Sequence, residues 1–102
     1  MNAAEVELAP RDQIIEILKK IEDPELYLDI WFLGLIYNIT IEGKQVDIEM
    51  TFTSPMCPFG PQLVEQVRKD ISDAGFAPVN ITVTFDPAWT PSDEVRAMLG
   101  MI

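Results

Sequence analysis

The chain has 102 residues, with 17 acidic and 7 basic side chains that give a formal net charge of −10. This length suits one domain, because two domains of half the size would each have too small a core to fold alone. Apolar residues make up 48% of the sequence, which is enough to form such a core and argues against global disorder. A surface this negative repels phosphate backbones and anionic lipids, so we expect neither nucleic acid nor membrane as a partner.

The cysteine and histidine content restricts the chemistry that one chain can perform. The sequence has one cysteine, Cys57, and no histidine. Without histidine, the usual Ser-His-Asp and Cys-His mechanisms are excluded, and one chain cannot supply the four ligands of structural zinc. A lone cysteine suits a reducing compartment, and residues 1–8 lack the basic and apolar regions of a signal peptide, so we expect a cytoplasmic protein.

Residues 1–9 are predicted to form a flexible N-terminal arm, and residues 10–102 a single folded domain. The first helix is predicted to begin at Pro10, because proline suits the first helical position. It is expected to end by residues 22–23, because Pro24 disfavours a helical residue before it. Its apolar stripe consists of Ile14, Ile17, Leu18 and Ile21.

The connection over residues 26–34 is unusually apolar for a loop, because it contains Trp31, Phe32 and Leu33. Such a segment is expected to pack against the body of the protein or against a partner chain. We predict a homodimer, with Trp31, Phe32 and, further along the chain, Trp89 at its interface. A simpler alternative is that each tryptophan covers a small core within one chain.

Two strands are predicted at residues 37–42 and 46–53, where apolar and polar side chains alternate. Residues 42–44 between them form a short hairpin loop. Because only one face of this pair is apolar, the sheet is expected to be covered on one side, with Thr51 and Thr53 on its polar face.

The helix that follows these strands is predicted to end at Gly75. Its apolar stripe consists of Val64, Val67, Ile71 and Ala74. If a third strand, over residues 79–85, lies parallel to the second, the connection between them is expected to cross over right-handed. A last short helix is predicted with Thr90 as its N-cap, Pro91 at the first helical position and Asp93 at the third.

The order of elements along the chain is therefore predicted to be α-β-β-α-β-α. A three-stranded sheet with one apolar face needs helices packed on that face. The sequence predicts a two-layer α+β fold, with a three-stranded sheet and helices on one face.

Cys57 lies between a predicted strand end and a predicted helix start, in a stretch that also contains Pro55 and Pro58. Unpaired amides and the helix dipole at such a place lower the pKa of a thiol below its usual value of about 8.5. A thiolate is both a nucleophile and a ligand for soft metals. Most free cysteines are instead small buried apolar residues, and this alternative stays open.

Two carboxylates and a hydroxyl are further candidates for the site. Asp23 and Glu25 are either a helix stop with solvated charge or carboxylates that support Cys57 or bind a metal. Thr53, at the strand end nearest Cys57, has a hydroxyl that can donate to a thiolate, although threonines in strands are usually only good strand formers.

Four stretches of the sequence carry a resemblance to a known family: DPEL at 23–26, LGLIY at 33–37, MTFTSPMCP at 50–58 and FDPAWTP at 85–91. With these motifs in this order, the chain resembles the SufT/PaaD-like family of iron–sulfur cluster assembly factors. That family is related to the N-terminal domain of Mrp/ApbC-type ATPases and to the eukaryotic cytosolic iron–sulfur targeting factor. The resemblance covers about residues 11 to 100.

The resemblance implies a fold like that of the C-terminal domain of NifU scaffolds. It also implies that Cys57 is the functional cysteine, with Asp23, Thr53 and Glu25 as its neighbours. Because a cluster normally takes four protein thiolates, one chain cannot hold it alone. Cys57 would then bind a labile iron–sulfur cluster or iron across a dimer or together with a client, and the fold needs no cofactor.

The expected function is that of an accessory factor, not an enzyme, in iron–sulfur cluster assembly or delivery. Its partners would be iron–sulfur assembly proteins and apo client proteins. The alternative is an adaptor without metal that docks clients, for example an oxygenase complex as in PaaD-like proteins, to the assembly machinery. A cysteine-dependent enzyme with Asp23 or Glu25 as its base is the least favoured reading.

Overall fold

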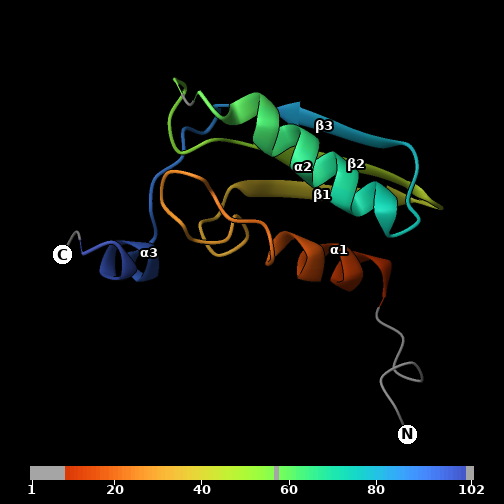
Figure 1. Cartoon of the computed structure of the whole chain (residues 1–102), viewed down its shortest axis with the longest axis horizontal. Coiled ribbons are helices and arrows are strands. Elements are labelled where there is room, and N and C mark those ends of the chain that lie inside the picture. Colours follow the sequence, from red (N-terminus) through yellow and green to blue (C-terminus); the bar gives the residue numbers. More distant parts are fainter. Residues whose placement is uncertain (1–8, 57, 101–102) are drawn as a thin grey trace, which may run out of the picture.

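The structure, a computed structural model, describes residues 9–56 and 58–100, and it has an α+β fold (Figure 1). The predicted arm over residues 1–9 thus lies almost wholly outside the described residues. Along the chain the elements are α1 (Pro10–Leu18), β1 (Ile36–Glu42), β2 (Gln45–Met50), α2 (Gly60–Asp73), β3 (Val79–Val83) and α3 (Asp93–Met98). No helix of the described ranges is long and apolar enough to cross a membrane.

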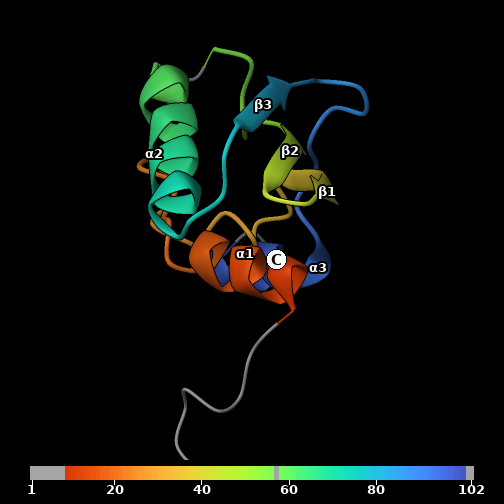
Figure 2. The same cartoon turned by 90° about the vertical axis from the view of Figure 1, so that its right-hand side faces the viewer.

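The three strands form one sheet in the order β1-β2-β3, with β1 antiparallel and β3 parallel to β2. Helices α1 and α2 pack on one face of this sheet, whereas α3 lies beyond the end at which β1 starts (Figures 1 and 2). The opposite face is open, and a shallow depression on it is lined mainly by polar side chains: Asn38, Thr40, Asp47, Glu49 and Thr82. The predicted one-sided cover of the sheet is therefore confirmed.

The core lies between the sheet and the two longer helices. Ile14 and Leu18 of α1 are fully buried, as predicted from the helical spacing. The predicted stripe of α2 is partly wrong, because the residues that face the core are Gly60, Leu63, Val67 and Ile71. Val64 is only partly buried, and Ala74 is exposed because α2 ends one residue before it.

The first helix ends at Leu18, four residues earlier than Glu22, where the proline rule put its end. The reason lies in a backbone pairing that the local sequence does not indicate. The N–H of Ile30 donates to the carbonyl of Ile21, and the N–H of Asp23 donates to the carbonyl of Leu28, both at 2.9 Å. These bonds draw residues 21–23 out of the helix and into a pairing with residues 28–30.

Strands β2 and β3 also end earlier than predicted, at Met50 and Val83. After Met50, the N–H of Thr51 still donates to the carbonyl of Leu35 at 2.8 Å, in the register in which Ile36 pairs with Met50, although the regular strand has ended. Thr51 is fully buried, so its assignment to the polar face was wrong.

The last helix begins two residues later than its capping signal predicted. Ser92 is the N-cap, and its hydroxyl accepts the N–H of Val95 at 3.2 Å, so Thr90 is not the cap. Both residues can cap a helix, and the position of the preceding segment determines which of them becomes the N-cap. That segment is held by Trp89, whose indole N–H donates to the carbonyl of Leu33 at 2.6 Å.

The apolar connection over residues 26–34 packs against the chain's own body. Leu33 is almost fully buried in the core, and Trp31, Phe32 and Trp89 are partly buried against it. The packing of this segment thus needs no second chain. The homodimer interface at Trp31, Phe32 and Trp89 stays a prediction.

Candidate functional site

The loops that carry the family-like motifs gather at one end of the sheet, where β2 and β3 end and α2 begins (Figure 1). Residues 51–59 connect β2 to α2, and residues 84–92 connect β3 to α3. The segment after α1 joins them, because Pro24 and Phe59 line the same groove. Motifs that are far apart in the sequence therefore meet at this end, which we call the loop end.

Cys57 lies outside the described residues, so its predicted position beside Asp23 and Thr53 stays a prediction. Its two neighbours in the sequence, Met56 and Pro58, are both exposed, and Met56 is 85% exposed. The hydroxyl of Ser54 accepts the N–H of Met56 at 3.2 Å, which gives the loop a local turn before the cysteine position.

The N-terminus of α2 lacks a capping side chain among the described residues. Its N-cap is Phe59, which makes no side-chain cap hydrogen bond, and Pro61 in the first turn has no N–H to donate. An uncapped helix start offers backbone N–H groups and a partial positive charge to an anion. A thiolate or another anion at this place would be stabilised by both.

Gly60, the first residue of α2, allows the helix to start very close to the preceding loop. A Cβ atom at this position would lie 2.5 Å from the ring of Phe52, which is far closer than side chains tolerate. The ring of Phe52 in turn packs edge to face with Phe85, with centroids 6.0 Å apart. These contacts tie the ends of both strands to the start of α2.

Asp23 is the most unusual residue of the loop end. Its side chain is fully buried, and its Oδ1 accepts the N–H groups of Glu25 at 2.8 Å and of Leu26 at 3.0 Å. Its Oδ2 is also buried, yet it has no hydrogen-bond partner among the described residues. A buried carboxylate oxygen without a partner is costly and rare in folded proteins, so it calls for a functional explanation.

The other predicted site residues differ from Asp23 in their surroundings. Glu25 is exposed, so only the first of the two carboxylates is buried at the loop end. Thr53 is partly buried and lies in the loop after β2 instead of in the strand. The structure thus places Asp23, Glu25 and Thr53 in the loops of the same end, but it does not give their relation to Cys57.

Large apolar side chains at the loop end are features that the sequence reasoning missed. Met56, Phe59 and Phe85 are 85%, 41% and 40% exposed. In the sequence, Met56 and Phe59 stand in the proline-rich stretch around Cys57, and Phe85 stands at the end of the third predicted strand. Neither pattern indicates an exposed apolar side chain. Exposed apolar side chains at one end of the molecule favour contact with another protein.

The described residues do not form a metal site by themselves. Among them there is no group of three or more cysteine, aspartate or glutamate side chains that could hold a metal ion.

Known proteins share this α+β fold and these motifs. Residues 11–83 match the iron–sulfur cluster assembly protein family, and the chain belongs to that family. It is 33% identical over 100 residues to a Porphyromonas gingivalis protein named Fe-S protein maturation auxiliary factor. The aligned residues cover 93% of this chain and 95% of that protein.

Two further comparisons agree with this assignment. The chain is 34% identical over 87 residues to the Bacillus subtilis Fe-S protein maturation auxiliary factor YitW, covering 83% of this chain and 85% of that one. A crystal structure from Bacillus anthracis, of a domain of unknown function named DUF59, superposes with a TM-score of 0.82 at 32% identity. That match covers 99% of this chain and 100% of the other. The resemblance found in the sequence is confirmed, and the protein has a role in iron–sulfur cluster assembly.

Proposed function

We propose that this protein is a non-catalytic accessory factor that helps to deliver iron–sulfur clusters or iron to client apoproteins, with Cys57 as its functional thiolate. Relatives over most of the chain are named maturation auxiliary factors, which supports delivery more than turnover of a metabolite. Because one chain offers one thiolate and a cluster takes four, the remaining ligands come from a second copy, a scaffold or the client.

The observation that carries this proposal is the buried carboxylate of Asp23. Its Oδ2 has no partner among the described residues, although the rest of the group is held firmly by two backbone N–H groups. Such a rigid, unpaired oxygen is suited to accept a ligand, either an iron ion or a proton. Pro24, the next residue, lines a groove with Phe59, only two residues after Cys57 in the sequence.

The electrostatics of the loop end suit a labile cargo. The uncapped start of α2 favours a thiolate at Cys57, whereas a nearby ionised Asp23 disfavours it. A bound metal ion reverses this balance, because it neutralises both anions at once. Without metal the two groups oppose each other, and with metal they act together.

A matched pair of variants tests the role of Asp23. Asp23→Asn should make Cys57 react faster with iodoacetamide in the metal-free protein, and it should lower the iron and sulfide retained after anaerobic reconstitution. Glu25→Gln removes a carboxylate that is exposed and only two residues away, and it should leave both quantities unchanged. If Asp23→Asn leaves alkylation rate and iron content unchanged, Asp23 is only a turn cap and the proposal loses its main support.

The adaptor without metal remains the second candidate, and the exposed side chains of Met56, Phe59 and Phe85 favour it. A Cys57→Ser variant separates the two functions. For a cluster carrier, this variant should lose iron retention and also fail to transfer a cluster to an apo-ferredoxin. A variant that still supports maturation of the client without bound iron would favour the adaptor instead.

Self-association is part of the carrier proposal, because two protomers would supply two thiolates to one cluster. We propose a homodimer with Trp31, Phe32 and Trp89 at its interface. The charge of −10 on each chain opposes it, so association should be stronger at high salt, where repulsion is screened. Sedimentation that shows only an 11.5 kDa species at every salt concentration would contradict the dimer.

A further inference from the structure

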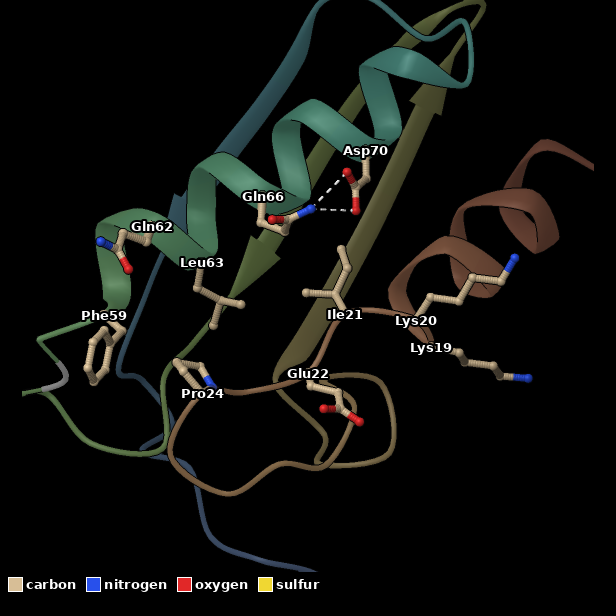
Figure 3. Close-up of a pocket in the computed structure, with 10 residues that line it drawn as sticks. All are labelled: Lys19, Lys20, Ile21, Glu22, Pro24, Phe59, Gln62, Leu63, Gln66 and Asp70. Carbon is tan, nitrogen blue, oxygen red and sulfur yellow. Dashed lines mark hydrogen bonds between the residues drawn. The ribbon is translucent and has the colours of Figure 1, made fainter.

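A groove runs along the seam between the end of α1 and the first half of α2 (Figure 3). Its volume is about 650 Å³, and Ile21 and Leu63, both almost fully buried, form its apolar floor. Pro24 and Phe59 close it at the loop end. A second depression of about 310 Å³ continues the groove toward the end of α2, because Lys20 and Asp70 line both.

The charges along this groove are only partly neutralised within the protein. Lys19 pairs with Glu16 at 3.9 Å, and Lys69 pairs with Asp73 at 2.9 Å, which raises the pKa of Lys69 above its usual value. Within the described ranges, Asp70 is hydrogen-bonded to the neutral amide of Gln66, at 2.9 Å (Figure 3), and its charge adds a smaller contribution to the raised pKa of Lys69.

The groove therefore keeps acidic groups available for a partner. Neither Asp70 nor Glu22 has an ion-pair partner among the described residues, and both line the groove. Lys20, on the α1 side of the groove, also has no ion-pair partner within the described ranges. With a net charge of −10 on the chain, the surrounding field also favours a basic partner.

We propose that this groove docks a short amphipathic segment of the client apoprotein, with apolar side chains on the floor and basic side chains facing Asp70 and Glu22. This inference rests on the proposed function, since it identifies where the client binds. A volume of this size lies in the range of roughly 300–1,000 Å³ that proteins use to bind ligands, and it accommodates a few apolar side chains. A second copy of this acidic chain would instead bring like charge to the groove.

The place of the groove explains what docking would achieve. Phe59, at its end, is two residues after Cys57 in the sequence and at the start of α2. A client segment held along α2 would therefore stay tethered close to the loop that carries the thiolate. Tethering raises the effective concentration of the client's ligands near the cargo without any new contact at the cysteine.

Two synthetic peptides of twelve residues serve as probes. Both have leucines at helical spacing, and their polar positions are lysine in one and glutamate in the other. The lysine peptide should bind more tightly and should shift the backbone NMR signals of Ile21, Leu63 and Gln66. The signals of Thr40 and Glu49 on the open sheet face should not move.

Charge variants give effects of opposite sign. Asp70→Lys should weaken binding of the lysine peptide about tenfold, and Lys20→Glu should strengthen it by a similar factor. Glu49→Lys changes the net charge as much as Asp70→Lys does, but it lies on the open face and should alter the affinity less than about twofold. If Asp70→Lys and Glu49→Lys lower the affinity for the lysine peptide equally, the binding is nonspecific charge attraction and the proposal is overturned.

A steric variant tests the groove independently of charge. Gln66→Trp places a large side chain from α2 into the groove, whereas Ser72→Trp adds the same group at an exposed position of α2 that does not line it. Gln66→Trp should abolish peptide binding, and Ser72→Trp should not. Unchanged binding in Gln66→Trp, or a change in sedimentation instead of peptide binding, would overturn the proposal and, in the second case, assign the groove to a second copy.

The docking site and the cysteine function can fail separately. The Cys57→Ser variant should bind the lysine peptide as well as the wild-type protein does, because the groove residues are unchanged. Loss of cluster transfer in Gln66→Trp together with normal iron retention would place the fault in docking alone. Normal cluster transfer to apo-ferredoxin in Gln66→Trp would refute the docking site while leaving the role of Cys57 intact.

Discussion

The two ends of the sheet are built in different ways. At the end opposite the loop end, which we call the hairpin end, Gly43 and Lys44 join β1 to β2, and Gly43 adopts the positive φ of 61° that a tight turn requires. The N–H of Ala77 donates to the carbonyl of Lys44 at 2.8 Å, and Lys44 lies 5.8 Å from the centre of the Phe76 ring. Connections here are short, and their backbone groups bind each other.

The loop end does not follow this pattern of short connections with paired groups. Asp23 is buried there with an unpaired oxygen, Met56 is 85% exposed, and α2 starts without a capping side chain among the described residues. The unpaired buried oxygen and the missing cap both lower stability compared with an obvious alternative. Places where a protein departs from local rules are expected to be functional, so the comparison assigns stability to one end and partner binding to the other.

The largest effect on stability should come from the packed body between the two ends. Ile71→Ala removes a fully buried side chain from the half of α2 near the hairpin end, and it should lower the free energy of unfolding by about 2–5 kcal/mol. Urea denaturation followed by circular dichroism measures this change. Ser72→Ala, exposed on the same helix, is the control and should alter stability little.

A smaller loss is expected at the loop end from Gly60→Ala. The added Cβ would collide with the ring of Phe52, and the cost of about 1–3 kcal/mol should exceed the gain of helix propensity. Denaturation measures the loss, and the double variant Gly60→Ala with Phe52→Leu should recover part of it. A stable single variant would mean that the start of α2 is not tied to the loop in this way.

Trp89→Phe should have a still smaller effect, because it removes one hydrogen bond and leaves most of the ring area. The carbonyl of Leu33 would lose the indole N–H at 2.6 Å, which should cost about 0.5–1.5 kcal/mol. Trp31→Phe, in the connection over residues 26–34 that contains Leu33, is the comparison, and thermal unfolding measures the loss of stability in each variant. Equal losses in both variants would show that ring packing, not the hydrogen bond, attaches the segment after β3.

The smallest change in stability should come from Asp23→Asn. The asparagine carbonyl can still accept the N–H groups of Glu25 and Leu26, and a neutral amide costs less to bury than a carboxylate. The variant should therefore be at least as stable as the wild-type protein in urea while it retains less iron. A loss of more than about 1 kcal/mol would mean that the charge of Asp23 stabilises the fold and is not reserved for function.

Much of this fold follows from local sequence signals. Pro10 begins α1 as its fixed φ predicts, and the alternation of apolar and polar residues locates three strands and the hairpin between the first two. Four short motifs were also enough to identify the iron–sulfur cluster assembly family. The prediction of Cys57 as the functional thiolate came from the same signals and remains to be tested.

The site itself was only partly predictable. The sequence selected Asp23 as a candidate, but as a residue at the end of a helix, and nothing local indicated its full burial. Its surroundings depend on the pairing of residues 21–23 with 28–30, which a local pattern does not indicate. Phe85 was assigned to the third strand and Phe59 lies in the proline-rich stretch around Cys57. Their exposure was not predicted, because exposure is a property of the assembled surface.

By itself the sequence determined which segments become helices and strands, since φ preferences, capping and apolar periodicity act over a few residues. Where those segments end was decided by the tertiary structure. Residues 21–23 left the helix because backbone groups of Leu28 and Ile30 bind them. Partners outside the helical spacing of four residues become available only when the chain folds back on itself, and the packing of this fold also creates the core, the loop end and the groove along α2.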